Sequence, residues 1–168
     1  PAATSVTVAE LALGLMLSIA RSIPQATQSL REGKWEKKAF KGTELYGKTL
    51  GLIGSGRIGS ELAKRCVAMG MSVVVFDPFI KECVAGRLCE FPELLKQADY
   101  ISLHVPKTDK TTHIINRETI AQMKKGVVII NCARGGVVDE APLYDALVSG
   151  QVRAAALAVF ETEPLKDF

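Results

Sequence analysis

The sequence is poor in the residues that usually hold metal ions or form disulfide frameworks, since its 168 residues include four cysteines and two histidines. The cysteines are scattered, with no CxxC pair and no metal-ligand spacing: Cys66, Cys83, Cys89 and Cys132. This distribution excludes a zinc-finger type of site and a fold held together by disulfides. Cys66 in a predicted helix and Cys132 at a predicted strand end occupy positions where buried thiols are common, and a reducing compartment fits the four cysteines best. We therefore expect no metal ion and a cytoplasmic location.

Long hydrophobic runs and charge of one sign are also missing. The longest apolar stretch, Leu11 to Ala20, is about half the length that crosses a bilayer, and no charged segment precedes it as in a signal peptide. The formal net charge is +3, and the densest basic stretch, residues 34–41, is interrupted by Glu36. Such a stretch is typical of a solvated loop. We expect one globular domain whose partners include neither a membrane nor nucleic acid.

What the chain does contain is a glycine pattern in a specific context. An apolar run at residues 49–53 leads into Gly54-x-Gly56-x-x-Gly59, and a helix-like segment follows from Ser60 to Met69. A second apolar run, Ser72 to Phe76, then ends on Asp77. The order strand, glycine turn, helix, strand and carboxylate within about thirty residues is typical of a dinucleotide-binding unit.

Each glycine has a physical role in this interpretation. Gly54 lets the chain turn sharply off the strand, and Gly56 leaves the backbone open to a pyrophosphate. Gly59 lets the helix pack closely on the strand. The helix that begins here directs unpaired N–H groups and the positive end of its dipole at the phosphates.

Asp77 indicates which dinucleotide binds. It lies 18 residues beyond Gly59, where its carboxylate can accept hydrogen bonds from both hydroxyls of an adenosine ribose. The same charge would repel a 2′-phosphate, so the expected cofactor is NAD rather than NADP. The alternative is a glycine-rich turn in an ordinary α/β core, with Asp77 capping a strand.

The rest of the chain alternates extended and helical patterns. Strands are predicted at residues 100–105, 127–132 and 154–160, and helices at residues 91–97, 117–124 and 140–149. Apolar runs with little polar alternation indicate strands that are buried on both faces. The predicted fold is α/β: a doubly wound parallel (Rossmann) sheet, with nucleotide at the carboxyl ends of the strands.

The amino-terminal segment differs from this core. From Ser5 to about Leu30 apolar residues recur at helical spacing, with a kink expected at Pro24. Because the first half is apolar on more than one face, we expect it to pack against another domain or subunit. The alternative is a helix packed on its own sheet. The whole chain, 1–168, is thus predicted to be one dinucleotide-binding domain, with a helix at 1–30 and a core at 47–168.

Several motifs together resemble one family, the D-isomer-specific 2-hydroxyacid dehydrogenases. They span nearly all of the chain in the family's order: Ser5–Glu10, Gly47–Gly51, Gly54–Gly59, His104–Pro106, Asn131–Glu140 and Val159–Pro164. The resemblance implies NAD as the cofactor and a small 2-hydroxy or 2-keto acid as the substrate. It also implies a homo-oligomer formed through the amino-terminal helix.

The resemblance also assigns roles to residues. It places the pyrophosphate on Arg57 and Ile58, beside Gly54, Gly56 and Gly59, the adenosine on Asp77 and Val105, and the nicotinamide ribose near Cys132 and Ala133. Arg134 matches the family's substrate arginine, whose planar fork suits a carboxylate. Glu163 matches the carboxylate that pairs with the catalytic histidine, holds its tautomer and raises its pKa.

The chain departs from the family pattern in two places. The catalytic histidine of the family lies some twenty residues after the position of Glu163, and neither His104 nor His113 sits in its motif. General acid–base catalysis and most of the substrate domain are therefore expected to be absent. Ala158 stands where the family usually has an aspartate that accepts a hydrogen bond from the nicotinamide carboxamide, which puts the orientation of that ring in doubt.

The substrate is the least determined feature. Three segments, Gly33–Trp35, Gly42–Leu45 and Asn131–Gly136, are most similar to the family members that oxidise 3-phosphoglycerate in serine synthesis. The alternatives are a relative acting on glyoxylate, hydroxypyruvate, glycerate or lactate, and an NAD-sensing interaction protein similar to the corepressors that share this fold.

Overall fold

The computed structural model describes residues 2–166, so Pro1, Asp167 and Phe168, at the ends of the predicted domain, lie outside the described residues. A six-stranded sheet, parallel throughout, forms the centre in the order β3-β2-β1-β4-β5-β6. The strands are β1 (Thr49–Ile53), β2 (Ser72–Phe76), β3 (Arg87–Leu88), β4 (Tyr100–Leu103), β5 (Val127–Asn131) and β6 (Val152–Leu157). All residues of β4 and β5 are buried, as their unbroken apolar runs predicted.

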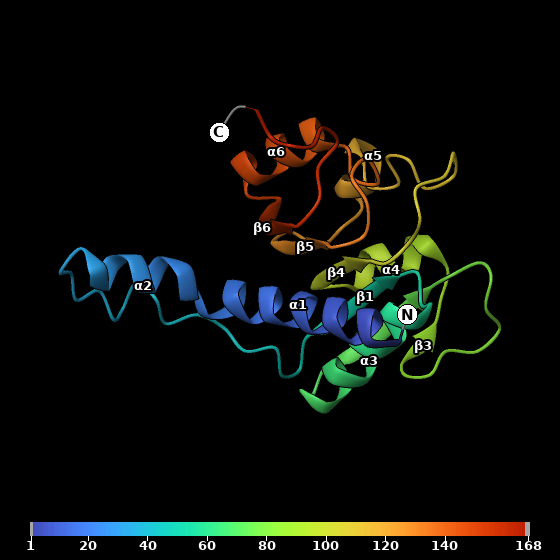
Figure 1. Ribbon diagram of the computed structural model, residues 1–168, viewed down its shortest axis with the longest axis horizontal. Coiled ribbons are helices and arrows are strands. Elements are labelled where there is room, and N and C mark those ends of the chain that lie inside the picture. The colour runs from blue at the N-terminus through green and yellow to red at the C-terminus, as the bar shows by residue number, and fades with distance from the viewer. Residues whose placement is uncertain (1, 167–168) are drawn as a thin grey trace.

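Helices cover both faces of this sheet (Figure 1). They are α1 (Ala2–Arg21), α2 (Ile23–Arg31), α3 (Arg57–Ala68), α4 (Phe91–Gln97), α5 (Arg117–Ala121) and α6 (Glu140–Ser149). On one face, α1 and α3 bury Met16 and Leu62 with strand residues that include Val128. On the other face, α4, α5 and α6 bury Leu94 and Leu143 with strand residues that include Ile129. Neighbouring residues of β5, Val128 and Ile129, thus pack into cores on opposite faces of the sheet. This confirms the prediction of a doubly wound sheet.

The amino-terminal segment is two helices rather than one kinked helix. The break lies at Ser22, whose backbone is left-handed (φ +51°), and Pro24 stands in the first turn of α2. A proline there removes an N–H that the helix would leave unpaired in any case. The prediction of a kink at Pro24 is therefore wrong, and α2 instead projects from the body as an arm (Figure 1).

Other element ends differ from the sequence prediction for local reasons. The third predicted strand, 154–160, is β6, which begins at Val152 and ends at Leu157 because its partner β5 ends at Asn131, opposite Leu157. The helix predicted to reach residue 124 stops at Ala121, and the side-chain amide of Gln151 donates to the carbonyl groups of Ile120, within the helix, and Met123, beyond it. The strands predicted at 100–105 and 127–132 end at Leu103 and Asn131, and the helix predicted from residue 60 begins at Arg57.

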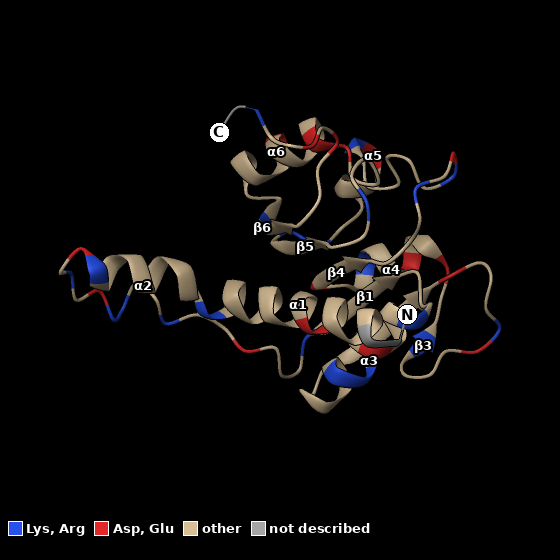
Figure 2. Cartoon of the chain, viewed as in Figure 1, with Lys and Arg blue, Asp and Glu red and all other residues tan. Residues whose placement is uncertain are grey.

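Helix α1 is almost uncharged: Glu10 and Arg21 are its charged residues (Figure 2). Residues Thr4–Arg21 are long and apolar enough to cross a bilayer by length and composition alone, with a mean hydropathy of 1.3. One face of α1 packs on α3 and the sheet through Ala9, Ala12 and Met16, all 0% exposed. Helices in protein cores share this composition. On the opposite face Leu11 is 48% exposed, so α1 packs on its own domain through one face, as in the alternative interpretation, and leaves apolar surface uncovered on the other.

Candidate functional site

The predicted cofactor residues lie where the winding of the sheet reverses. Strands β1 and β4 are neighbours, but β1 connects onward to β2 on one side and β4 to β5 on the other. The loops that follow these two strands therefore diverge at the carboxyl edge, and a crevice beside the glycine loop is lined by residues that include Gly56, Arg57 and Ser60. Gly54 and Val105 are packed against each other: a Cβ atom on Gly54 would lie 2.8 Å from Cγ1 of Val105.

The three glycines have the environments that their proposed roles require. Gly54 has φ +89°, and an added Cβ would lie 2.5 Å from the carbonyl oxygen of His104. An added Cβ on Gly59 would lie 2.5 Å from the carbonyl oxygen of Gly54, which is the close approach of helix to strand. Around Gly56 no described atom lies within 4 Å of that position. The backbone is tightly packed at both ends of the loop and open in its middle, where a phosphate would approach.

Asp77 is already fixed against this loop. Its Oδ2 accepts a hydrogen bond from the backbone N–H of Ser55 at 2.8 Å, and its Oδ1 accepts one from Phe79 at 2.9 Å. A carboxylate has about four acceptor positions, so each oxygen retains one. Asp77 can therefore bind two ribose hydroxyls without losing the contacts that orient it.

A second loop, after β5, presents the residues predicted at the nicotinamide side. Buried Asn131 holds this loop: its Oδ1 accepts the N–H of Ala133 at 3.0 Å, and its Nδ2 donates to the carbonyl of Arg134 at 3.1 Å. The guanidinium of exposed Arg134 donates from one nitrogen to the Ala133 carbonyl at 2.7 Å, which leaves its other donors available to a ligand. Burial raises the pKa of the Cys132 thiol, so this side chain stays protonated and unreactive at neutral pH.

The turn that carries Glu163 packs directly on the arginine loop. A Cβ atom on Gly135 would overlap the backbone carbonyl of Phe160, so only glycine permits this approach. The Oε1 of Glu163 accepts the N–H of Phe160 at 2.8 Å, which folds the side chain back onto its own turn. Ala158 is exposed at the end of β6, and its N–H donates to the carbonyl of Asn131 at 3.0 Å. Arg134, Ala158 and Glu163 therefore come from adjoining loops at one edge.

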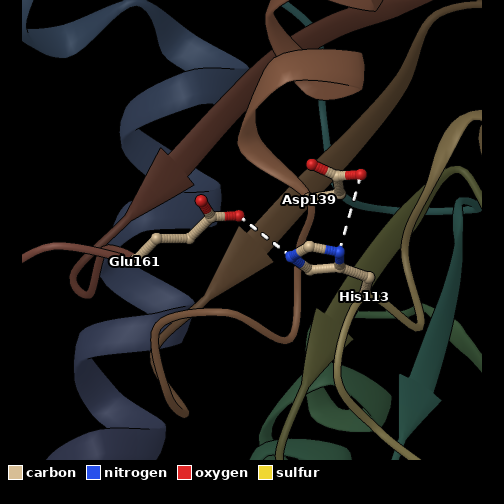
Figure 3. A group of neighbouring side chains, drawn as sticks. All are labelled: His113, Asp139 and Glu161. Carbon is tan, nitrogen blue, oxygen red and sulfur yellow. Dashed lines mark hydrogen bonds and ion pairs between the residues drawn. The ribbon is translucent and has the colours of Figure 1, made fainter.

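The two histidines of the chain occupy different environments. The backbone of His104 packs against the glycine loop, its Nε2 lies 2.8 Å from Oγ of Ser102, and its Nδ1 is buried without a partner among the described residues. Burial lowers the pKa of His104 to about 4, so the ring is neutral at pH 7. His113 is exposed and lies between two carboxylates, with Nε2 3.2 Å from Glu161 and Nδ1 3.7 Å from Asp139 (Figure 3).

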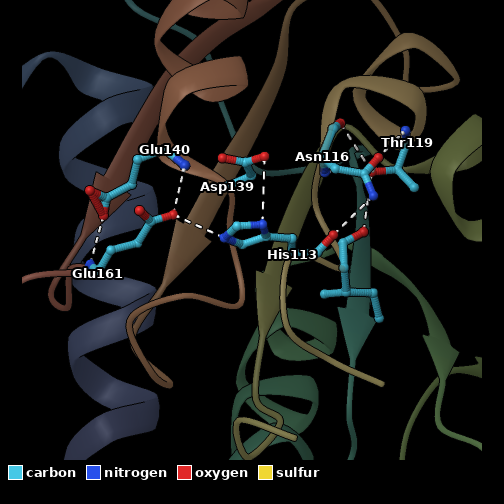
Figure 4. A network of polar contacts seen from close by, with 7 residues as sticks. His113, Asn116, Thr119, Asp139, Glu140 and Glu161 are labelled. Atoms are coloured by element: carbon cyan, nitrogen blue, oxygen red, sulfur yellow. Dashed lines mark hydrogen bonds and ion pairs between the residues drawn. The ribbon is translucent and has the colours of Figure 1, made fainter. Parts of the chain in front are cut away.

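His113, Asp139 and Glu161 form a cluster in which one ligand atom of each residue lies within 4.8 Å of the others, a spacing that could hold a metal ion. The two carboxylates face different nitrogens of the ring (Figure 3 and Figure 4). The sequence-based expectation of no metal site stays a prediction.

The predicted site residues thus fall into two groups. Around the crevice lie Gly54, Gly56, Arg57, Ile58, Gly59, Asp77 and Val105, and after β5 and β6 lie Cys132, Ala133, Arg134, Ala158 and Glu163. Sequence analysis missed two residues that hold the second group, Asn131 and Gly135. The sequence offered two signals for them: Asn131 is a polar residue at the end of an apolar strand, and Gly135 is a glycine next to Arg134.

Comparisons with known proteins agree with this geometry. Residues 13–168 match the model of the D-isomer specific 2-hydroxyacid dehydrogenase, NAD binding domain. The D-3-phosphoglycerate dehydrogenase of Methanocaldococcus jannaschii is 58% identical over 99% of this chain and 33% of its own length. The hydroxypyruvate reductase of Thermotoga maritima is also 58% identical, over 99% of this chain and 55% of its own length.

A solved structure extends the comparison. The D-lactate dehydrogenase of Aquifex aeolicus, complexed with NAD and lactic acid, superposes with a TM-score of 0.88 at 39% sequence identity. The match covers 93% of this chain and 48% of that one. The chain thus spans between a third and about half of the length of these relatives.

Proposed function

Because the chain belongs to the D-isomer-specific 2-hydroxyacid dehydrogenases, as their NAD-binding domain, we propose that it holds NAD for hydride exchange with a 2-hydroxy acid. The observation that carries this proposal is the crevice at β1 and β4, where an open Gly56 stands beside a pre-oriented Asp77. NAD supplies the hydride acceptor when bound. The residues described here bind and orient the reactants.

The cofactor half of the proposal assigns one contact to each group. The N–H groups at the start of α3, with Arg57 and Ile58, would hold the pyrophosphate. The free acceptor positions of Asp77 would take both hydroxyls of the adenosine ribose and would repel a 2′-phosphate. Val105 would line the adenosine, and Cys132 and Ala133 would approach the nicotinamide ribose.

The substrate half rests on Arg134 and Glu163. The remaining donors of the Arg134 guanidinium can bind a 2-keto or 2-hydroxy carboxylate through two parallel hydrogen bonds. Glu163 would orient a histidine that exchanges the hydroxyl proton as hydride moves. His104 is neutral and buried, and His113 lies between Asp139 and Glu161, so that histidine would come from outside these 168 residues.

For the substrate we propose 3-phosphoglycerate, oxidised to 3-phosphohydroxypyruvate in serine synthesis. Support comes from the 58% identity to the phosphoglycerate dehydrogenase of M. jannaschii. The hydroxypyruvate reductase of T. maritima matches equally well, which makes reduction of a short 2-keto acid the second candidate. Activity of the longer protein that carries this chain, with 3-phosphoglycerate and with hydroxypyruvate, separates the two: the preferred substrate has the higher kcat/KM.

We also propose that the chain forms a homodimer through the exposed face of α1 and α2. Leu11, Ile23 and Leu30 are each at least 48% exposed along this face, and a two-fold contact is the commonest way to bury such a surface. Sedimentation analysis over a range of concentrations tests this proposal. A chain that stays monomeric at high concentration contradicts it.

The cofactor proposal is tested by calorimetric titration of the chain with NAD⁺, NADH and NADP⁺, repeated with Ala158→Asp. We expect micromolar to low-millimolar binding of NAD⁺ and NADH, and weaker binding of NADP⁺. Restoring a charged acceptor should tighten binding by about 1.5–3 kcal/mol if the carboxamide reaches position 158. Failure of both forms to bind would refute the cofactor site.

A further inference from the structure

Glu161 attaches the segment beyond β6 to the rest of the domain. Of the described residues in this segment, 159–166, it is the one that forms hydrogen bonds with other elements, to Glu140 and His113. The backbone N–H of Glu161 donates to Oε2 of Glu140 at 2.8 Å, and Oε1 of Glu161 accepts the N–H of Glu140 at 3.2 Å (Figure 4). Each glutamate therefore accepts the backbone N–H of the other.

The start of α6 favours this exchange. Glu140 is the first residue of the helix, after the N-cap Asp139, and its N–H is one of the four that a helix leaves without an intrahelical partner. Glu161 accepts this N–H, and the positive end of the helix dipole favours a carboxylate at this place. The same contact brings the side chain of Glu140 beside the backbone of the segment.

The contact with Glu140 fixes the orientation of one peptide group. The N–H of Glu161 and the carbonyl of Phe160 belong to the same planar unit, so a group that holds the N–H also orients the carbonyl. This unit lies directly against Gly135: a Cβ atom there would overlap the Phe160 carbonyl and would lie 3.1 Å from the nitrogen of Glu161. The peptide group therefore packs on Gly135 while its N–H is bound to Glu140.

This peptide group separates two residues that face the substrate in the function proposed above. On one side, Gly135 directly follows Arg134 in the chain. On the other side, the N–H of Phe160 donates to the Glu163 carboxylate at 2.8 Å. A rotation of the peptide would break its packing on Gly135 and shift Phe160 relative to both. Glu140 holds this peptide and therefore sets the separation of the two residues.

We propose that Glu140 is a positioning residue of the substrate site: its carboxylate holds the peptide group that separates Arg134 from Glu163. The inference depends on the proposed function for the roles of Arg134 and Glu163. The hold on the peptide is a property of this chain, and it requires the length of the side chain and an acceptor atom. A role for Glu140 in stabilising α6 through the helix dipole would require the negative charge instead.

Two conservative substitutions separate these roles in amide hydrogen exchange of the whole chain. Glu140→Gln keeps the length of the side chain and a carbonyl oxygen that accepts the Glu161 N–H, but it removes the charge. Glu140→Asp keeps the charge at the start of α6 but is one methylene group too short for this contact. We expect exchange at Glu161 to accelerate roughly tenfold in Glu140→Asp and Glu140→Ala, and no more than about threefold in Glu140→Gln.

Spectra and kinetics add readouts that the stability of α6 does not control. The ¹H–¹⁵N resonance of Phe160 should move in Glu140→Asp and stay in place in Glu140→Gln, because its N–H reports the Glu163 carboxylate. In the longer protein that carries this chain, Glu140→Asp should lower kcat/KM for the 2-hydroxy acid about tenfold, while KM for NAD⁺ stays unchanged. The matched control is Glu118→Ala, which removes a glutamate from the first turn of α5 and should change none of these quantities.

Three outcomes overturn the proposal: unchanged exchange at Glu161 in Glu140→Ala, exchange in Glu140→Gln as fast as in Glu140→Asp, or an equal change in Glu118→Ala. Amides of β4 and β5 should keep their rates in every variant, so that a change confined to the turn excludes general unfolding. A chain with the expected exchange that binds no NADH supports the hold on the peptide and refutes the proposed function. A chain that binds NADH without the expected exchange refutes the positioning role alone.

Discussion

The two halves of the proposed site are built by different means. On the proposed cofactor side, Gly54 and Gly59 pack against backbone carbonyls, beside His104 with its buried Nδ1. On the substrate side, exposed Arg134 and Glu163 lie on loops that side chains tie together, among them Asn131 and Glu161. A substitution that disrupts packed backbone at the site should lower the stability of the whole fold. A substitution that removes a side-chain contact should alter the geometry of the site and leave the fold intact.

The largest effect is expected from Gly54→Ala. The residue has φ +89°, and its Cβ would lie 2.5 Å from the His104 carbonyl, so the free energy of unfolding should fall by about 3 kcal/mol or more. Urea denaturation measures this change. The matched control is Gly14→Ala in α1, where no described atom lies near the added Cβ and stability should rise by about 0.5–1 kcal/mol. Equal effects at the two positions would contradict the role of packed backbone.

The second largest expected effect is a dependence of stability on pH, caused by His104 on the cofactor side. The pKa of His104 is about 4 when folded, whereas an unfolded histidine titrates near 6.5. Between these values the unfolded chain binds the proton and the folded chain does not. Stability therefore falls as the pH is lowered from 6.5 to 4, by about 2–3 kcal/mol in total. The midpoint of urea denaturation, measured from pH 7.5 to 4.5, should fall with pH in this way, and His104→Gln should make the fall smaller. A variant that keeps the full slope would contradict the assignment.

On the substrate side, Gly135→Ala should be less damaging than Gly54→Ala. The added Cβ overlaps the Phe160 carbonyl, but this carbonyl belongs to a partly exposed turn that can move away. We expect a loss of about 1–2 kcal/mol in unfolding free energy, together with faster amide exchange in residues 158–163. A loss as large as that of Gly54→Ala would mean that this turn is as rigid as the glycine loop.

The smallest effect should come from Arg117→Ala, which removes the exposed ion pair to Asp145 between α5 and α6. Such pairs contribute about 0.2–1 kcal/mol, and added salt should reduce the difference from wild type. Thermal unfolding at low and high ionic strength measures it. A change above 1 kcal/mol that persists in salt would show that side-chain contacts also support the fold on this side.

The same contrast explains what the sequence could predict. The doubly wound sheet follows from apolar runs in the chain, and the roles of Gly54, Gly59 and Asp77 follow from spacing within about thirty residues. These features are local, so their pattern is visible without a structure. The break at Ser22 was missed because a left-handed serine has no clear sequence signal. Strand β3 was missed because two residues are too short to show a period.

The contacts of the substrate side could not be predicted for a different reason. Glu161 meets Glu140 and His113 across 21 and 48 positions of the chain. His113 alone is indistinguishable from an ordinary surface histidine, and Asp139 alone reads as an ordinary helix cap. Only the packing of three loops brings these side chains together.

The space around Gly56 has a consequence for how this protein tolerates mutation. No described atom lies within 4 Å of a Cβ added there, so a population screened only for folding would accept alanine at position 56 as silent. A population screened for NAD binding should reject it, because in the function proposed above the methyl group would fill the space assigned to the pyrophosphate. Positions that accept alanine in the first screen and reject it in the second would therefore identify the residues that lie against the ligand.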